Sequence, residues 1–238
     1  MNRCFGFLCL SLLLLAAAGC SSKDGIRNGP AQEEAVPTVR NKATLPRVLL
    51  IGDSISMGYL PHVQRLLKGT AYVEHPAANC RSTAEGLRDL DNWLGSEGWD
   101  VIHFNWGLHD LKYVDSEGRK VAVSVGTQNV PVEQYEKNLE ELVIRLKKTG
   151  AKLVFATTTP VPEGASGRVP GDAARYNTVA VEIMNKHATR VDDLYALAMQ
   201  RPGEIQRPGN VHFTEPQGYE VLARQVAAEI RNVLAERL

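Results

Sequence analysis

Val48-Leu49-Leu50-Ile51-Gly52-Asp53-Ser54 is the stretch of sequence from which the fold can be predicted. Its unbroken apolar run, closed by Gly52, is typical of a strand buried on both faces of a parallel sheet. Ser54 then opens a helical pattern over 54–67, in which Pro61 should cause a kink or a restart. A strand that passes directly into a helix places the serine at the carboxyl edge of the sheet.

The same alternation of short apolar runs and longer helical patterns continues along the chain. Strands are predicted at 71–74, 100–104, 152–157 and 189–191, and helices at 83–94, 131–148, 172–186 and 215–236, with a helical turn from Asp193. We therefore expect a three-layer α/β/α domain over 46–238, with a flavodoxin-like parallel sheet of about five strands. Three further segments are predicted as loops around the ligand crevice of the sheet: 111–130, 158–171 and 200–211.

The bulk composition narrows the class of function. The chain has 238 residues, with 27 Lys and Arg against 27 Asp and Glu, and its formal net charge is zero. A dedicated nucleic-acid binder usually carries a basic excess, so we expect no nucleic-acid partner. The length allows one ordinary domain with a sizeable core.

The N-terminus is predicted to be a targeting segment. Arg3 precedes an apolar run over 5–18, which is too short for a good membrane span and is typical of a signal peptide. Ala17-Ala18-Gly19-Cys20 resembles the lipobox of bacterial lipoproteins, in which the cysteine is lipidated. We expect a signal peptide over 1–20, lipid on Cys20, a flexible linker over 21–45 and a location in the bacterial cell envelope. Secretion after cleavage nearby is the alternative.

The remaining cysteines do not indicate a disulfide or a metal site. Cys4 and Cys9 leave with the signal peptide, so Cys80 is alone in the predicted domain. A small buried apolar side chain is its expected role. The chain has no CxxC or clustered His and Cys that would indicate zinc, and we expect no metal and no cofactor.

Ser54 is a candidate nucleophile, although Asp or Ser at this position could equally cap the helix. A serine nucleophile needs a base, and His212 lies in a loop directly before the last helix. His109 follows the strand at 100–104 and should face the same crevice. His103 should be in the core, and the other histidines, His62, His75 and His187, should have surface or packing roles.

These residues resemble, in order, the conserved blocks of the SGNH/GDSL hydrolases. Gly52-Asp-Ser-Ile55 matches the first block, Gly107-Leu-His-Asp110 stands where Gly-x-Asn-Asp is usual, and Gly209-Asn-Val-His212 stands where Asp-x-x-His is usual. The resemblance covers most of 46–238. It implies an SGNH fold, Ser54 as nucleophile and His212 as base.

Two departures from the family pattern concern the oxyanion hole. The second block, 78–83, has no glycine, so a backbone N–H of Cys80 or Arg81 would join that of Ser54, with the Asn79 side chain as an alternative. His109 replaces the third-block asparagine, and an imidazole N–H can donate as an amide does. Asn105 is the rival donor.

The third departure concerns the acid that orients the histidine. Gly209 occupies the position of the family's aspartate, and loss of that acid costs about 10⁴ in turnover in a conventional triad. A backbone carbonyl near Gly209 could accept the Nδ1 proton, which would give a Ser-His dyad, the arrangement we favour. The amide oxygen of Asn210 and a distant acid, Asp192 or Asp193, are the alternatives.

The sequence leaves three functions open. The first is an esterase for a small acyl ester, for example an O-acetylated carbohydrate, and Trp106 beside the crevice would suit a sugar. The second is a non-catalytic envelope binding lipoprotein with a degenerate site. The third is an O-acyltransferase, which would use the same serine and exclude water. Neither the substrate nor the oligomeric state follows from the sequence.

Overall fold

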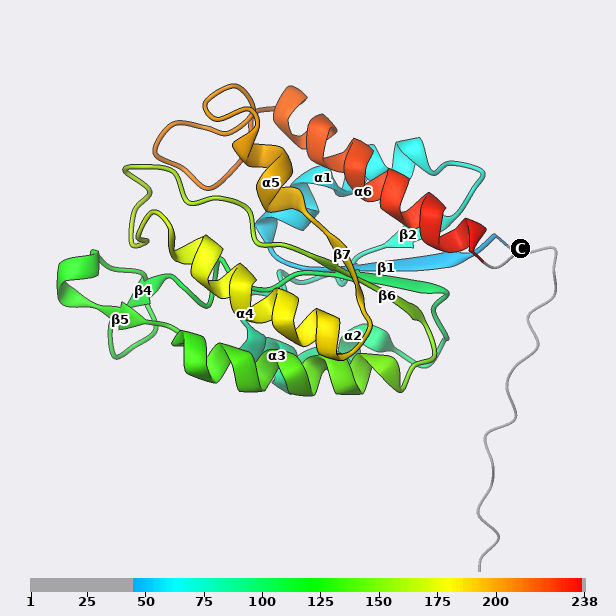
Figure 1. Ribbon diagram of the computed structural model, residues 1–238, viewed down its shortest axis with the longest axis horizontal. Coiled ribbons are helices and arrows are strands. Elements are labelled where there is room, and N and C mark those ends of the chain that lie inside the picture. The colour runs from blue at the N-terminus through cyan, green and yellow to red at the C-terminus, as the bar shows by residue number, and fades with distance from the viewer. Residues whose placement is uncertain (1–44, 237–238) are drawn as a thin grey trace, which may run out of the picture. The chain divides into compact units, whose positions relative to one another are not determined.

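A five-stranded parallel sheet forms the middle layer of the protein, for which a computed structural model describes residues 45–236 (Figure 1). Its strands are β1 (Arg47–Ile51), β2 (Tyr72–Glu74), β3 (Val101–Phe104), β6 (Lys152–Ala156) and β7 (Arg190–Asp192). They lie in the order β2-β1-β3-β6-β7, and every neighbouring pair is parallel. The predicted fold class is therefore confirmed.

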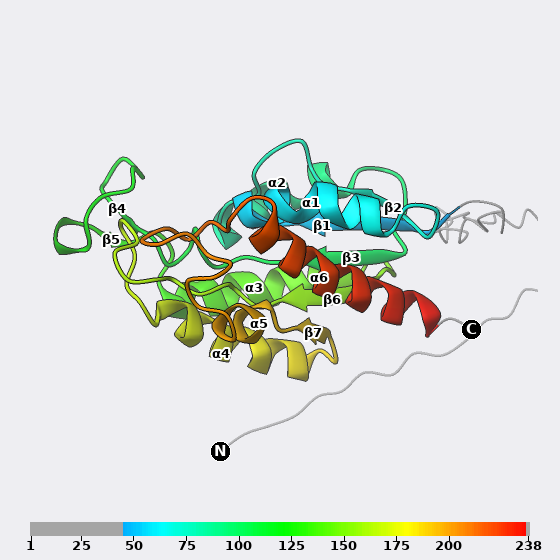
Figure 2. The same cartoon turned by 90° about the horizontal axis from the view of Figure 1, so that it is seen from above.

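Helices cover both faces of the sheet. They are α1 (Ser54–Leu66), α2 (Thr83–Leu94), α3 (Val132–Lys147), α4 (Asp172–Lys186), α5 (Leu194–Met199) and α6 (Gln217–Ala235). Helices α1 and α6 pack together on one face, with α5 against α6, while α3 packs between α2 and α4 on the other (Figures 1 and 2). Because all five strands run parallel, their carboxyl ends share one edge of the sheet.

The buried surfaces follow from the patterns in the sequence. The apolar run 48–51 is at most 2 % exposed, as expected for a strand covered on both faces. Helix α3 buries the apolar residues that recur at spacings of three and four: Tyr135, Leu139, Leu142, Val143 and Leu146. Burial of such apolar faces between the helices and the sheet contributes to the hydrophobic stabilisation of the domain.

Pro61 does not divide the first helix. Helix α1 is one element from Ser54 to Leu66 with Pro61 inside it, so the predicted restart does not occur. The proline ring lies on the exposed side of the helix, where the carbonyl group that loses its hydrogen bond can bond to water.

The segment 111–130 is more ordered than the predicted loop. It contains β4 (Tyr113–Val114) and β5 (Thr127–Gln128), which pair antiparallel, and a short 3₁₀ helix, η1 (Val123–Val125). This arm extends from the carboxyl edge of the sheet in both views of the ribbon (Figures 1 and 2). Strands of two residues are too short to show a periodicity in the sequence.

The predicted signal peptide 1–20, the lipidated Cys20 and the linker 21–45 fall outside the described residues, apart from residue 45. Within 45–236, no helix combines the length and the apolar character needed to cross a membrane.

Candidate active site

Ser54 is the first residue of α1, directly after the carboxyl end of β1. The residue that caps this helix is Asp53, whose buried Oδ1 accepts the N–H of Ile55 at 2.9 Å. The Ser54 hydroxyl is therefore not needed as a cap, and its Oγ lies 2.9 Å from Nε2 of His212. The Ser54 N–H has no hydrogen-bond partner among residues 45–236 and points from a helix N-terminus, where an oxyanion is stabilised.

Asn210 holds the other side of the His212 ring. Its Oδ1 lies 2.8 Å from Nδ1 of His212 and also accepts the His212 backbone N–H at 3.0 Å. This geometry favours the tautomer with a proton on Nδ1 and a free lone pair on Nε2, which faces Ser54. The partner of Nδ1 is thus the Asn210 amide and not the backbone carbonyl that we favoured from the sequence.

Gly209 stands where the resemblance would place an acid, and its backbone adopts a left-handed conformation with φ of 62°. A Cβ added there would lie 3.6 Å from the carbonyl oxygen of Gly164, so the turn has room for a side chain. The conformation nevertheless favours glycine over most residues.

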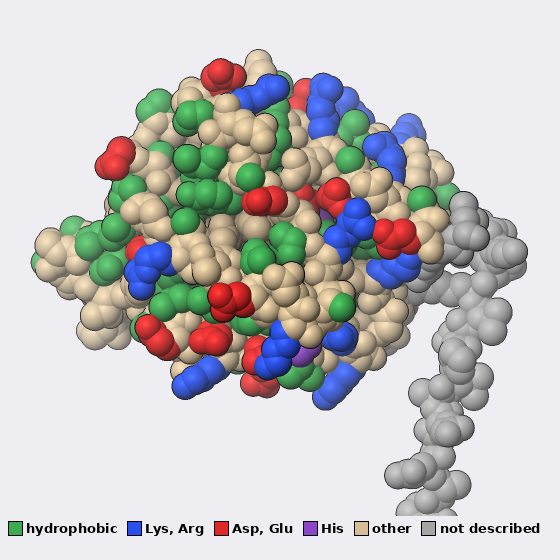
Figure 3. Space-filling view, viewed as in Figure 1, with side chains coloured by type: hydrophobic (Ala, Val, Ile, Leu, Met, Phe, Trp, Pro, Cys, Tyr) green, Lys and Arg blue, Asp and Glu red, His purple; other side chains and the backbone are tan. Residues whose placement is uncertain are grey.

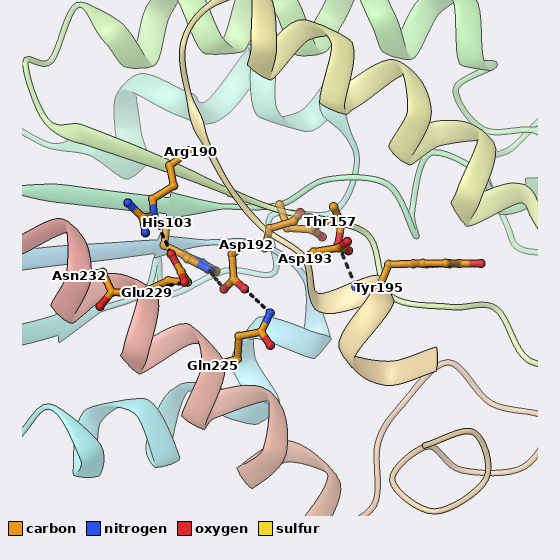
Figure 4. Close-up of polar contacts among 11 residues, drawn as sticks. His103, Thr157, Arg190, Asp192, Asp193, Tyr195, Gln225, Glu229 and Asn232 are labelled. Atoms are coloured by element: carbon orange, nitrogen blue, oxygen red, sulfur yellow. Dashed lines mark hydrogen bonds and ion pairs between the residues drawn. The ribbon is translucent and has the colours of Figure 1, made fainter. Parts of the chain in front are cut away.

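The two distant acids, Asp192 and Asp193, are hydrogen-bonded to groups other than His212 (Figure 4). Asp192 is 1 % exposed, lies 3.0 Å from Nε2 of the buried His103, and accepts a hydrogen bond from Gln225 at 2.7 Å. Asp193 caps α5 and accepts a hydrogen bond from the Thr157 hydroxyl. Neither carboxylate contacts His212, so the alternative in which one of them replaces the missing acid is not what the structure has.

The backbone donors expected from the second block are already paired. The Cys80 N–H donates to the Gly52 carbonyl oxygen at 3.0 Å, and the Arg81 N–H donates to Oδ1 of Asn79 at 2.9 Å. Arg81 has φ of 48°, the conformation for which glycine is usual. Asn79 itself lines the pocket beside Ser54, and its Nδ2 has no hydrogen-bond partner among the described residues. The Asn79 amide is therefore the free donor on this side.

Asn105 is not a free donor. Its Nδ2 donates to the Ala156 carbonyl oxygen at 2.8 Å and to the Thr158 hydroxyl at 3.3 Å, which joins the ends of β3 and β6. Trp106 does not border an open crevice either: it is 1 % exposed and packs against Phe104 in the core. Neither residue lines the pocket beside Ser54.

His109 lines the same pocket as Ser54 and His212. Its Nδ1 is buried without a hydrogen-bond partner in 45–236. Burial lowers the pKa of His109 to about 4, and the positive charges of Lys112 and Arg168 act in the same direction. The ring is therefore neutral at neutral pH and carries one N–H, as an oxyanion donor requires.

The electrostatics of His212 suit a general base. Its pKa lies below the usual 6.5, chiefly because burial disfavours the charged ring and secondarily because of Arg207, Arg168 and Lys120. At neutral pH the imidazole is unprotonated on one nitrogen and can accept the Ser54 proton.

Asp110 is a supporting residue whose contacts were not anticipated. It is fully buried, and its Oδ1 accepts both the N–H and the hydroxyl of Thr83, at 2.9 and 2.5 Å. Burial raises the pKa of Asp110 to about 7 despite these hydrogen bonds. The contact joins two segments that border the site. One is the loop after β3, which carries His109, and the other is the start of α2, directly after Asn79 and Arg81. Its only signal in the sequence is its place in the third block.

A second serine–histidine pair lies close to the first. Oγ of Ser56 is 2.9 Å from Nε2 of His75 and also donates to the Asp53 carbonyl oxygen. Ser56 is only 2 % exposed and does not line the pocket of Ser54. This pair has the packing role that we expected for His75.

The pocket beside Ser54 has a volume of about 430 Å³ and is bordered by residues from five parts of the chain, within 53–54, 79, 108–120, 165–168 and 209–212. Three cationic side chains that sequence reasoning missed also line it, namely Lys112, Lys120 and Arg168. Basic residues in predicted loops were their only signal. Within 45–236, no cluster of three or more His, Cys, Asp or Glu side chains has the geometry to hold a metal ion.

No family model and no curated relative matches the sequence. Among solved structures, a lipase/acylhydrolase from Enterococcus faecalis has a TM-score of 0.66 at 23% identity, covering 79% of this chain and 96% of its own. The acetylxylan esterase Axe2 from Geobacillus stearothermophilus has a TM-score of 0.62 at 18% identity, covering 78% and 94%. A GDSL-like lipase from Bacteroides thetaiotaomicron has a TM-score of 0.58 at 12% identity, covering 78% and 88%.

These likenesses extend over most of this chain and of each solved structure. At such identities they concern the fold and not the substrate. The chain has the α/β/α fold of the SGNH/GDSL hydrolases.

Proposed function

We propose that the protein is a serine-dependent ester hydrolase in which Ser54 is the nucleophile and His212 the general base. The observation that carries the proposal is the contact of 2.9 Å between Ser54 Oγ and His212 Nε2, with Nδ1 of the same ring held by Asn210. A nucleophile, a base and a group that orients the base are the three parts of a catalytic triad. Asparagine has this third role in papain-like proteases.

In the first half-reaction, His212 accepts the hydroxyl proton as Ser54 Oγ attacks the ester carbonyl carbon. The resulting oxyanion faces the free N–H of Ser54, and the side chains of Asn79 and His109 are the further donors. When the carbon–oxygen bond to the alcohol breaks, the leaving alcohol takes the proton from His212. The acyl group remains on Ser54.

In the second half-reaction, water takes the place of the alcohol. His212 accepts a proton from the water as its oxygen attacks the acyl carbon, and then returns a proton to Ser54 Oγ as the carboxylic acid leaves. Ser54 and His212 are both partly exposed, so water can reach the acyl-enzyme, which favours hydrolysis over transfer to another acceptor.

A small acyl group on a carbohydrate is our proposal for the substrate. The structural neighbours include esterases of acetylated xylan, and the polar lining of the pocket is compatible with a sugar. We also propose lipid attachment at Cys20, which mass spectrometry of the mature N-terminus would test.

The experiment that tests the function compares Ser54→Ala with Ser56→Ala on a short-chain acyl ester. Both variants remove one hydroxyl that contacts a histidine, but only Ser54 lines the pocket. We expect Ser54→Ala to lower kcat by about 10⁴ or more and Ser56→Ala to retain hydrolysis. Wild-type protein treated with a fluorophosphonate should gain one adduct, on Ser54. Equal activity of the wild type and Ser54→Ala would refute the proposal.

A further inference from the structure

The pocket beside Ser54 carries an excess of positive charge. Lys112 follows β3, Lys120 lies in the arm between β4 and β5, and Arg168 lies in the loop before α4, so three separate segments bring cations to one place. Asp53 is the one carboxylate among the residues that line this pocket. His109 and His212, which also line it, have pKa values below the usual 6.5 and add little charge at neutral pH.

These three cations have no ion-pair partner among residues 45–236. Several other basic side chains of the domain form ion pairs, for example Arg119 with Asp115, Arg145 with Asp91 and Arg190 with Glu229, whereas exposed lysines such as Lys137 form none with the described residues. On the face seen in Figure 3, acidic and basic side chains are interspersed. Because the whole chain has a formal net charge of zero, the excess in the pocket is local and not a consequence of a basic protein.

Arg168 is held in a position that suits an anion. Its Nε donates to the Leu108 carbonyl oxygen at 3.0 Å, while Nη1 and Nη2 have no hydrogen-bond partner in the described part of the chain. Burial lowers the pKa of Arg168, so the folded protein holds this charge at a cost that Asp53 only partly offsets. Oδ1 of Asp53 is engaged in capping α1.

Lys112 is likewise a positive charge that no nearby carboxylate of the pocket balances. It is partly buried, and burial is the main cause that lowers its pKa, with Arg168 and Arg81 acting in the same direction and Glu85 and Asp110 against it. Asp110 is buried beneath the pocket and Glu85 is hydrogen-bonded to Ser82, so neither carboxylate is directed into the cavity. A bound anion would supply the hydrogen-bond acceptors and the negative charge that Lys112, Lys120 and Arg168 lack among the described residues, as carboxylates and phosphates do at other basic sites.

We propose that the substrate is an ester that also carries an anionic group, a carboxylate or a phosphate, which Arg168, Lys112 and Lys120 bind while the ester carbonyl lies at Ser54. This inference rests on the proposed function, because it assigns the substrate class of the same site. A planar guanidinium with two free nitrogens can bind such an anion in a bidentate manner. The two lysines act as point charges that attract it into the pocket.

The first experiment compares substrates that differ only in charge. The neutral ester is an acetylated methyl glucoside, and the anionic esters are the matching methyl glucuronoside and methyl glucoside 6-phosphate, acetylated at the same hydroxyl. We expect kcat/KM for the better anionic ester to exceed that of the neutral one by about tenfold to a hundredfold, since charge-assisted hydrogen bonds contribute on this scale. The two anionic esters distinguish a carboxylate from a phosphate, and added salt should reduce the preference.

Variants that remove one positive charge test which side chains cause the preference for anionic esters. In Arg168→Gln and in Lys120→Gln, the ratio of kcat/KM for the anionic over the neutral ester should fall several-fold toward one. Lys137→Gln is the matched control, because Lys137 is an exposed lysine of α3 outside the pocket, and its ratio should stay at the wild-type value. Lys120 is exposed on the arm, so its replacement tests the proposal even where Arg168→Gln does not fold.

A binding measurement separates this inference from the proposed function. Isothermal titration of Ser54→Ala with methyl glucuronoside, glucose 6-phosphate and methyl glucoside requires no hydrolysis. Binding of an anion but not of the neutral sugar, lost in Arg168→Gln, supports the anion site even if no ester is cleaved. Hydrolysis of all esters at equal kcat/KM, or no difference in binding between charged and neutral sugars, overturns it.

Discussion

Replacing Asn210 by aspartate is expected to raise the pKa of His212 and to move the onset of ester hydrolysis to higher pH. The substitution keeps the shape of the side chain and changes a neutral oxygen, 2.8 Å from Nδ1 of His212, into a charged one. A carboxylate favours the protonated ring, whereas the amide oxygen only orients it. The variant therefore tests whether this contact sets the proton affinity of the base.

The size of the shift follows from the exposure of the pair. Two unit charges about 4 Å apart interact by about 1 kcal/mol in bulk water and by about 4 kcal/mol near a protein surface. Asn210 is exposed, so the lower part of this range applies, and roughly 1.4 kcal/mol corresponds to one pKa unit. In the wild type, burial, Arg207, Arg168 and Lys120 hold the pKa of His212 below 6.5. We expect Asn210→Asp to raise it by roughly one unit.

The assay is the pH dependence of kcat/KM for a short-chain ester, which reports the pKa values of the free enzyme. His212 acts as base when unprotonated, so activity rises with pH through its pKa, below 6.5 in the wild type and about one unit higher in the variant. Asn210→Leu is the matched control. It has a similar shape without an acceptor, and we expect it to lower kcat/KM by about tenfold or more through loss of ring orientation.

Two results would refute this reasoning. If the rising limb of Asn210→Asp coincides with that of the wild type, the oxygen at position 210 does not face the catalytic ring in solution. If Asn210→Leu retains full kcat/KM, the ring is oriented by another group and the Asn210 contact has no part in catalysis.

Three further predictions concern the oxyanion side, acid stability and helix packing. Asn79→Ala should lower kcat by about a hundredfold with little effect on KM, and an unchanged kcat would exclude its amide as an oxyanion donor. The pKa of His109, about 4 against a usual 6.5, means that stability is lost as pH falls from 6.5 toward 4, by about 2 kcal/mol at about pH 5. The free energy of unfolding of His109→Gln, measured in urea, should not show this loss. If the wild type and the variant lose stability in parallel as the pH falls, His109 is not the group whose protonation destabilises the protein. Gly58→Ala would place a Cβ 2.2 Å from the Tyr219 ring between α1 and α6, so the free energy of unfolding should fall by about 1 to 3 kcal/mol. In a Tyr219→Leu background the same change should cost less, and an equal cost would show that the ring is not the obstacle.

Most of the fold could be predicted because its signals are local. The apolar run 48–51 and the helical spacing over α3 each reflect burial on particular faces, and the structure buries those residues. The arm formed by 111–130 could not be predicted, since β4 and β5 have two residues each and are defined by their pairing with one another. The predicted interruption at Pro61 is wrong, because the exposed position of this proline allows α1 to continue.

In the candidate site, too, local features could be predicted from the sequence and contacts between distant segments could not. That Ser54 follows a buried strand and that His212 precedes the last helix could be inferred from the sequence, because strand ends and helix starts are local features. The hydrogen-bond partners of these residues could not be inferred in this way, because they depend on the tertiary structure. Asp192 is held in the core by His103, the N–H of Cys80 is taken by Gly52, and Asn210 alone contacts Nδ1 of His212 within the described residues. Hydrogen-bond partners depend on where distant segments meet and which groups are already paired, and a one-dimensional pattern does not contain that information.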